Sequence, residues 1–357
     1  MKFGIMFFSS ATSHNGENGQ HEKYRLLIDA ARYVDEHRFV SVWTPERHFH
    51  EFGGLFPNPS VTSAALAMIT QHVQLRSGSL VAPLHNPIRI VEEWSVVDNL
   101  SGGRAAISFG SGWNVNDFVF FPDRYKTRHG EMYRQIECIQ SLWQGGSITQ
   151  PNGNGLEVEL RPYPRPIQKE LPIWITSSGN VETFISAGAI GANLLTHMEH
   201  QSDQSLGEKI QRYRQARADN GFDPDAGIVS LMLHTFLGDD MERVKAKVRE
   251  PMRNYLRSAI NLERKAVAGG GTASGGYQVD DHEIDEEDME DLLDIIFERY
   301  FYNISLTGTV EHCKKRVDAL QAVGVNEIAC LIDFLDDGPA ILESLTYLSQ
   351  LRGLFAG

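Results

Sequence analysis

LPIWITSSGNVETFISAGAIGANLLTH, residues Leu171–His197, is the stretch that decides the fold. Within it, Ile173–Thr176 is short, apolar and rich in β-branched side chains, which predicts a buried strand. Ser177–Asn180 is a run of turn-forming residues. Val181–Ala189 then spaces its apolar residues as a helix does, and Ala192–Thr196 is a second apolar run. The stretch is therefore predicted to fold as strand, loop, helix and strand.

The loop of this unit is a candidate phosphate site. Two hydroxyls, a glycine and an asparagine, Ser177–Asn180, stand where a strand leads into a helix. Backbone N–H groups and the positive end of the helix dipole therefore face one small volume, which suits a phosphate. In barrels of alternating strands and helices, such loops lie on the carboxyl face beside the chemistry. The alternative is that Ser178 or Asn180 only caps the helix.

The same alternation continues along the chain. Strands are predicted at Lys2–Phe8, Val40–Thr44, Gln74–Val81, Arg104–Gly110, Ile173–Thr176, Ala192–Thr196, Ile228–Leu237 and Glu327–Ile332. Helices are predicted at Tyr24–His37, Pro59–Gln71, Pro87–Asn99, Met132–Trp143, Val181–Ala189, Asp203–Asn220, Asp240–Leu256, Val310–Val323 and Pro339–Leu354. Strands that alternate with helices imply a parallel sheet, and eight such units fit closure into a barrel. The predicted fold class is therefore α/β, a single TIM (β/α)8 barrel over residues 1–357 with insertions.

Two segments interrupt the alternation. Ser147–Arg165 is predicted to form a hairpin-like excursion. Asn261–Asn303 joins a glycine-rich run to an acidic cluster, and Val279–Asp294 alone holds ten carboxylates and no Lys or Arg. A barrel loop this long is usually functional or disordered, so residues 261–303 are interpreted as a mobile lid over the carboxyl face. The alternative is a solvated insertion without a role.

Composition limits the class of protein. The formal charge of −14 becomes −4 without the acidic cluster, because 33 basic residues then face 37 acidic ones. The rest of the surface is thus near neutral, which excludes a nucleic-acid footprint. Cys138, Cys313 and Cys330 lack metal-type spacing and indicate a reducing cytoplasm. No apolar run approaches the ~18 residues of a membrane span, and the start is too short for a signal peptide. We expect a soluble cytoplasmic protein.

Polar and aromatic side chains follow the predicted strands, where a barrel places its site. They are Phe7, Phe8, Arg47, His48, Ser79, Ser111, Trp113, Asn114, Ser177, Ser178, Thr196, His197 and Met198. This set contains no carboxylate pair, since Glu46 stands alone, and no GxSxG elbow occurs, which argues against glycoside hydrolysis and a serine nucleophile. The HFH histidines with His85, His197 or His200 leave a metal-dependent barrel hydrolase open. A phosphate loop beside a wide aromatic pocket instead favours a bulky cofactor.

Several motifs resemble one family in order and spacing. They are MKFGIMFFSS at residues 1–10, WTPERHFHEFGGLFPNPSV at 43–61, GSLVAPLHNPIRIVEEWSVVDNLSGGR at 78–104, SFGSGWNVNDF at 108–118 and the loop at Ser177 and Ser178. Together they are similar to the bacterial luciferase-like flavin-dependent monooxygenases. Two motifs, TPERHFH at residues 44–50 and GVNEIACLIDF at residues 324–334, resemble those of the subgroup found in natural-product and siderophore biosynthesis.

The resemblance implies a barrel that binds reduced FMN at its carboxyl face. There the flavin reacts with O2, and one oxygen atom passes to a small organic or carrier-protein-bound substrate. No dinucleotide fingerprint follows any strand, so a separate flavin reductase is expected to supply the reduced FMN. A homodimer is also expected. The alternatives are a deazaflavin-dependent oxidoreductase and a flavin-binding protein without catalytic activity.

The resemblance also assigns roles to residues. It implies cofactor binding by Met6, Trp43, Gly78, Ser79, Ser111, Gly112, Trp113, Asn114, Tyr125, Thr176, Ser177, Ser178, Gly179, Asn180, Thr196, His197 and Met198, and no metal. Gly78 and Ser79 match the position of a non-prolyl cis peptide beneath the flavin ring, and Tyr125 matches a phosphate-binding tyrosine. His48 falls in the family's active-site histidine region and is implied as catalytic; luciferases proper carry two adjacent histidines there, and here the first is Arg47. We expect Arg47 to be catalytic as well, as a cation that stabilises anionic flavin or a substrate carboxylate or phosphate. The alternatives are a surface ion pair for Arg47 and plain packing for Trp43 and Tyr125.

Overall fold

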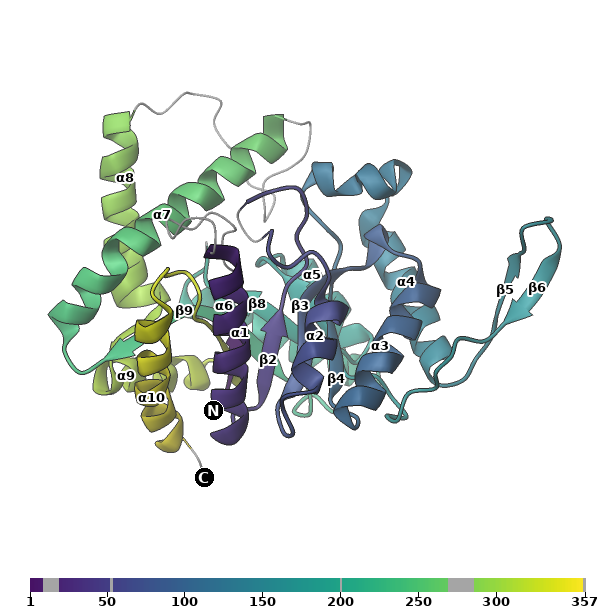
Figure 1. Cartoon of the computed structure of the whole chain (residues 1–357), viewed down its shortest axis with the longest axis horizontal. Coiled ribbons are helices and arrows are strands. Elements are labelled where there is room, and N and C mark those ends of the chain that lie inside the picture. The colour runs from purple at the N-terminus through teal and green to yellow at the C-terminus, as the bar shows by residue number, and fades with distance from the viewer. Residues whose placement is uncertain (9–18, 52–53, 200, 269–285, 356–357) are drawn as a thin grey trace.

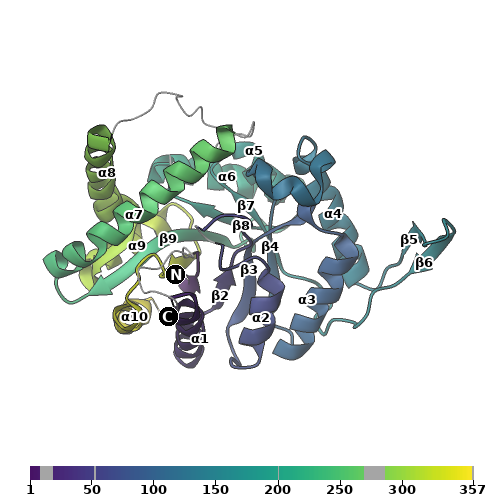
Figure 2. The same ribbon diagram turned by 45° about the horizontal axis from the view of Figure 1, so that its top comes forward.

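The computed structural model describes residues 1–8, 19–51, 54–199, 201–268 and 286–355. A closed barrel of parallel strands stands at its centre, wrapped by helices (Figures 1 and 2). The predicted TIM barrel is confirmed.

The barrel strands follow one another in sequence order. They are β1 (Lys2–Met6), β2 (Ser41–Thr44), β3 (Gln74–Val81), β4 (Ala105–Gly110), β7 (Ile173–Ser177), β8 (Asn193–His197), β9 (Val229–Gly238) and β11 (Glu327–Leu331). Strand β11 pairs with both β9 and β1, which closes the ring. A short strand, β10 (Leu306–Thr309), adds to β9 outside the ring. Every predicted strand therefore occurs, with ends shifted by a few residues at most.

The covering helices also lie where periodicity places them. They are α1 (Gly19–Glu36), α2 (Pro59–Ala67), α3 (Pro87–Ser101), α4 (Arg128–Trp143), α5 (Val181–Ala189), α6 (Asp203–Asp219), α7 (Met241–Ala268), α9 (Val310–Ala322) and α10 (Gly338–Gly353). Local chemistry sets several ends. The side chain of Asn58 caps α2 and that of Asn86 caps α3, and a proline follows each cap. Gly102, with φ of 70°, ends α3 in the left-handed region that glycine adopts without strain.

The barrel interior below the carboxyl face holds a buried ion pair. The guanidinium of Arg76 donates to Glu327 at 2.7 Å. It lies 4.6 and 4.2 Å from the ring centroids of Trp43 and Trp174, which meet edge to face. Trp43 is fully buried in this layer. Trp43 therefore has the position of a core residue, which was the alternative to a role in cofactor binding.

The segment between β9 and β10 is the main departure from prediction. Helix α7 runs twelve residues past its expected end, and α8 (Glu286–Arg299) and a π-helical turn (Tyr300–Ile304) follow. Basic residues of α7 pair with acidic ones of α8: Arg249 with Asp294 at 2.9 Å, and Arg253 and Arg257 with Glu290. Within the expected lid, residues 269–285 lie outside the described residues. Acidic residues of α8 therefore hold that helix against α7 through ion pairs.

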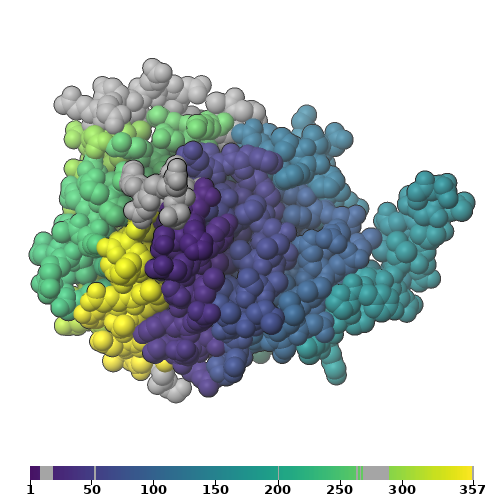
Figure 3. Space-filling model, viewed as in Figure 1, coloured from purple at the N-terminus to yellow at the C-terminus, as the bar shows by residue number. Residues whose placement is uncertain are grey.

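The predicted excursion at Ser147–Arg165 is a two-stranded hairpin, β5 (Ile148–Pro151) and β6 (Glu157–Leu160). It forms an arm that projects from the body, at the right in Figures 1 and 3. All three cysteines are free thiols. Among the described residues, no helix is both long and apolar enough to cross a membrane.

Candidate active site

A cavity of about 270 Å³ lies at the carboxyl ends of the strands. Strand ends and the loops after them form its floor, and Tyr255, Ala259 and Leu262 of α7 form its roof. Of the predicted site residues, those that line the cavity are Met6, Arg47, Gly78, Ser79, Ser111, Gly112, Trp113, Thr176, Ser178, Thr196 and His197. Those that do not line it are Trp43, His48, Asn114, Tyr125, Ser177, Gly179, Asn180 and Met198.

The residues of the predicted phosphate loop after β7 have two roles: some stabilise the turn and the start of α5, and one lines the cavity. The Ser177 hydroxyl accepts from the backbone N of Gly179 at 3.2 Å and donates to the carbonyl of Asn180 at 3.4 Å, so it braces the turn. The Asn180 side chain caps α5 by accepting from the backbone N of Glu182 at 2.9 Å. The capping alternative therefore holds for Asn180. Ser178 is the hydroxyl of this loop that faces the cavity.

Glycines let the floor approach a ligand with bare backbone. The Gly78–Ser79 peptide bond is cis, as the resemblance implied. A Cβ on Gly78 would lie 2.6 Å from the Met6 side chain, and Gly112 has a φ of 79°, where a side chain is strained. Beside them the hydroxyls of Ser79 and Thr176 hydrogen-bond to each other. The floor is thus a flat glycine cradle edged with hydroxyl groups.

The loop after β4 supports the cavity from behind. Asn114 caps a short 3-10 helix, and its amide donates to Asp117 at 3.0 Å. The Tyr125 ring packs edge-on against Phe118 at 5.1 Å, and its hydroxyl donates to the carbonyl of Trp113 at 3.5 Å. The packing alternative for Tyr125 describes this position, and the ring holds the Trp113 backbone in place.

Arg47 lines the cavity between two aromatic faces. Its guanidinium carbon lies 4.4 Å from the ring centroid of Phe8 and 5.7 Å from that of Trp113. Burial lowers the pKa of Arg47, and the neighbouring Asp117 and Tyr255 oppose that shift. A guanidinium stays protonated in proteins, so Arg47 presents a positive charge to whatever occupies the cavity.

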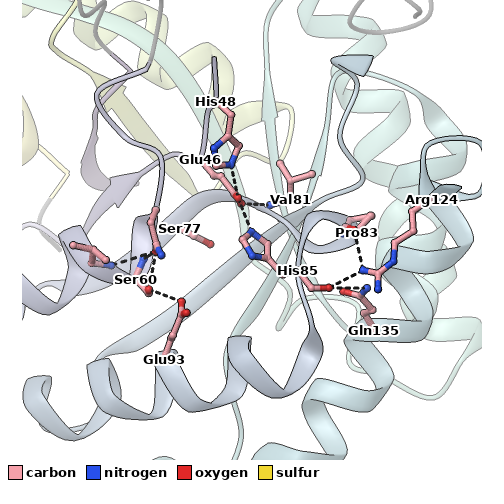
Figure 4. Close-up of polar contacts among 12 residues, drawn as sticks. Glu46, His48, Ser60, Ser77, Val81, Pro83, His85, Glu93, Arg124 and Gln135 are labelled. Carbon is pink, nitrogen blue, oxygen red and sulfur yellow. Dashed lines mark hydrogen bonds and ion pairs between the residues drawn. The ribbon is translucent and has the colours of Figure 1, made fainter. Parts of the chain in front are cut away.

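Glu46, His48 and His85, which we call the Glu46 cluster, form a site that sequence reasoning missed (Figure 4). Oxygen Oε1 of Glu46 contacts Nε2 of His48 at 2.9 Å and Nε2 of His85 at 2.5 Å, and Oε2 accepts from the backbone N of Val81 at 2.7 Å. Burial raises the pKa of Glu46, but these hydrogen bonds outweigh it and leave the pKa lowered. Burial lowers the pKa of His85, and Glu46 more than reverses this. The carboxylate is therefore ionised and favours a protonated His85.

The same geometry bears on the metal alternative. His48 and His85 do come together, as a metal site on the HFH histidines requires, but they meet on the Glu46 carboxylate. Among the described residues no group of three potential ligands is placed to hold a metal ion. His200 lies outside the described residues.

Asp117 is a second buried carboxyl beside this wall. Burial raises its pKa to about 6, while the positive charges of Arg47 and His48 oppose the shift. No local pattern indicates this, because Asp117 follows no strand directly and acquires its neighbours through the loop after β4.

The sequence matches the family model of the luciferase-like monooxygenases over residues 1–327. The chain belongs to this family. It is 26% identical over 276 residues to the oxygenase component of a flavin-dependent trigonelline monooxygenase from Acinetobacter baylyi, covering 75% of this chain and 74% of the relative. The protein is therefore a flavin-dependent monooxygenase, and the metal-dependent hydrolase is set aside.

Two solved structures of other monooxygenases have the same fold as this luciferase-like monooxygenase. The monooxygenase RslO1 from Streptomyces bottropensis superposes with a TM-score of 0.77 at 20% identity, over the full length of both chains. The oxygenating constituent of 3,6-diketocamphane monooxygenase, encoded on the CAM plasmid of Pseudomonas putida and solved with FMN, has a TM-score of 0.76 at 17% identity, covering 99% of this chain and 98% of that one.

The cavity of this monooxygenase fits a flavin. Gly78 and Gly112 line the cavity with backbone, and packing against Met6 and Trp43 leaves no room for a side chain at Gly78, so this part of the floor would take a flat ring. Ser178 and the start of α5 would take a phosphate, since hydroxyl and backbone N–H donors meet there. The residues present therefore suit a phosphorylated, planar cofactor.

The cavity-lining residues of the roof of the monooxygenase are one tyrosine and two aliphatic residues, and none of them carries a charge. Burial raises the pKa of Tyr255, and the ring of His234 meets it edge-on at 4.4 Å. Burial lowers the pKa of His234 to about 4, so that imidazole is neutral. The Tyr300 hydroxyl, just after α8, donates to Glu199 at the cavity wall at 2.8 Å. Sequence reasoning missed these residues because none of Tyr255, His234 and Tyr300 belongs to a recognisable motif.

Proposed function

We propose that the protein is the oxygenase component of a two-component system. It would receive reduced FMN from a separate flavin reductase and place one oxygen atom of O2 into a small organic or carrier-bound substrate, in the biosynthesis of a secondary metabolite. The observation that carries the proposal is the glycine cradle with Ser178 at its edge, because it combines a flat floor with donors for one phosphate. No dinucleotide fingerprint accompanies it in the sequence.

The residues of the cavity would divide the work. Bound reduced flavin supplies the two electrons that activate O2; the second oxygen atom leaves as water, which takes up protons. Ser178 and the α5 N-terminus hold the phosphate, and the floor at Gly78 and Ser79 orients the ring. Phe8, Trp113 and the roof exclude water, which protects a reactive site from side reactions.

Arg47 and His48 would serve the transfer itself. Arg47 offers a planar cation between two aromatic faces, so it favours a flat substrate with an anionic group. His48 stands behind Arg47 and hydrogen-bonds to Glu46, a position from which it supplies the proton. Its ring does not line the cavity, so the proposed transfer would run past Asp117, whose pKa His48 influences.

Flavin titration tests the proposal. Purified protein is titrated without oxygen against reduced FMN and, separately, against a reduced deazaflavin, and the FMN complex is then mixed with O2 and a flavin reductase. We expect selective binding of FMN and hydrogen peroxide formation when no substrate is present. Selective binding of the deazaflavin without oxygen consumption would overturn the proposal in favour of a deazaflavin-dependent oxidoreductase. FMN binding without oxygen consumption would indicate a flavin-binding protein without catalytic activity.

We further propose a homodimer. Half of the large apolar side chains that are exposed in the described chain lie on α2, α3 and the arm or within two residues of their ends: Val61, Met68, Val96, Leu100, Leu156, Leu160, Tyr163 and Ile167. The carbonyl of Arg165 accepts from Asn99 at 2.8 Å and ties the arm to α3. An isolated two-stranded hairpin is marginal in water, so a partner surface would stabilise the arm. A second copy supplies the same apolar face.

Light scattering of the purified chain checks the dimer. Leu100→Asp together with Leu160→Asp should give a folded monomer, because a buried carboxylate at each position disfavours association. Leu354→Asp, an exposed apolar position on the last turn of α10, is the matched control and should leave the dimer intact. A monomeric wild type would refute the proposal.

We also propose that the protein is one domain whose excursion over residues 261–303 closes the cavity. Leu262 already lines the cavity, and Tyr300 anchors the far end of the excursion to Glu199. A cytoplasmic location is proposed as well, since the three thiols remain free.

A further inference from the structure

The Glu46 cluster joins two loops that leave neighbouring strands. Glu46 follows β2, and His85 follows β3 after a short 3-10 turn, Ala82–Leu84. The backbone N of Glu46 donates to the carbonyl of Ser79 at 3.0 Å, so the cluster is fixed directly to the cavity floor. Figure 4 shows the two imidazoles approaching one carboxylate from opposite sides.

Exposure changes sharply across the cluster. The side chain of His85 is 29% exposed, that of His48 is 12% exposed and that of Glu46 is 0% exposed. His85 is therefore the member that exchanges protons readily with water. His48 follows the cavity-lining Arg47 in the chain and lies close enough to Asp117 to oppose the rise in the pKa of that carboxyl. The cluster thus connects the solvent with the wall of the cavity.

One carboxylate charge balances one imidazolium. Because a single oxygen of Glu46 contacts both rings, a first added proton is stabilised by that charge, whereas a second would place two cations beside one anion. Titrations that interact in this way belong to the group and not to one ring. Other charges also face His85: Glu93 on α3 favours its protonation, and Arg124 opposes it.

We propose that the Glu46 cluster holds one proton that His85 and His48 share, so that the solvent-facing His85 sets the pH up to which His48 can donate a proton toward the cavity. Only N–H and O–H bonds change: a proton enters the cluster from water, and one leaves it when oxygen transfer consumes it. Glu46 and His85 are positioning residues that act through His48. The inference rests on the proposed function only for the use of the proton.

The first test needs no flavin. Imidazole signals of the apo protein are followed by NMR against pH in the wild type, Glu46→Gln, His48→Gln and His72→Gln. In Glu46→Gln, His85 should titrate about one pH unit or more lower, because the charge that favours its protonation is gone. In His48→Gln it should titrate in one full step, with its midpoint about half a pH unit lower than the first, partial step of the wild type, because one ring then holds the proton alone. His72, which precedes β3 at the opposite end of the barrel, is the matched control and should change nothing.

The second test uses turnover. The fraction of reduced flavin that yields product is measured against pH, with hydrogen peroxide as the alternative product. In His85→Gln the plateau of the yield should rise and the alkaline limb of this profile should move about half a pH unit lower, because one ring then holds the proton that two rings shared, while flavin affinity stays unchanged. A purely structural role would lower the yield at every pH and leave the limb in place, which would overturn the proposal. An unmoved His85 titration in His48→Gln would overturn it too. Absence of any flavin turnover in the wild type would instead refute the proposed function and leave the proton sharing to be decided by NMR.

Discussion

Both sides of the cavity have buried ionisable groups, but the group on one side is charged and the group on the other is neutral. On the floor side, the carboxylate of Glu46 is fully buried, yet three donors hold its pKa below the usual value. On the roof side, burial lowers the pKa of His234 to about 4, and among the described residues its Nε2 has no hydrogen-bond partner. Burial favours the neutral form unless hydrogen-bond partners compensate the charge. The floor side therefore carries charge and protons, whereas the roof offers neutral aromatic surface.

The largest effect should come from the charged side. His48→Ala is expected to lower the yield of oxygenated product by roughly 10²- to 10⁴-fold, the usual contribution of a positioned proton donor, while flavin affinity changes little. Hydrogen peroxide should rise in its place. Product and peroxide are quantified per reduced flavin consumed, and His129→Ala, on α4, is the control. Full product yield in His48→Ala would show that another group supplies the proton.

A smaller effect should separate the two serines of the phosphate loop. Ser178→Ala should weaken FMN binding by about tenfold or more, since a lost hydrogen bond to a charged group costs ~1.5 to 3 kcal/mol. Ser177→Ala should weaken it less, because that hydroxyl braces Gly179 and Asn180 instead of facing the cavity. Affinities are read from fluorescence titrations. Equal losses of FMN affinity in the two variants, or no loss in either, would contradict phosphate binding by Ser178.

The contrast between these serines also shows what sequence can predict. Regular strand and helix periods predicted the barrel because each element is decided by its own residues. The polar loop after β7 could be predicted for the same reason. Sequence alone could not show that the Ser178 side chain faces the cavity and that of Ser177 does not. Glu46 seemed isolated because its partner His85 lies 39 residues away and meets it only through the pairing of β2 with β3.

The roof was harder to predict for a different reason. Glycine-rich and acidic composition led to the prediction of a mobile lid over residues 261–303, and sequence could not show that Glu290 and Asp294 would face the basic side of α7. Tyr300 likewise gains its role only through contact with Glu199, 101 positions earlier. Such contacts depend on how the excursion docks on the barrel, which no local pattern encodes.

Asp117 tests the effect of burial on the charged side of the cavity. Its hydrogen-bond donors do not compensate for burial as those of Glu46 do, so its pKa is raised. Its pKa rises from 3.8 to about 6, so the folded state favours the protonated form. That stabilisation is fully present below about pH 4 and is lost as pH rises through about 6. Asp117→Asn should therefore be more stable than the wild type by about 1 to 3 kcal/mol at pH 7 and equal to it near pH 4. Urea unfolding at both pH values, with the exposed Asp123→Asn as control, measures this. A constant difference at both pH values would contradict the assigned shift.

The smallest effect should come from the roof. Deleting Val267–Asp285 removes the tip of the excursion, whose residues 269–285 lie outside the described residues, and leaves the roof residues Tyr255, Ala259 and Leu262 in place. The barrel should stay folded and bind flavin, because none of its strands or cradle residues is touched. If the excursion serves to keep water out, peroxide release should rise by roughly a few-fold, since water access opens a competing route. Tyr300→Phe is the matched variant: it retains the entire excursion but loses the hydroxyl that donates to Glu199. It should raise peroxide release in the same direction and by less. If both variants couple reduced flavin to product as tightly as the wild type, the neutral roof shapes the substrate site without closing it.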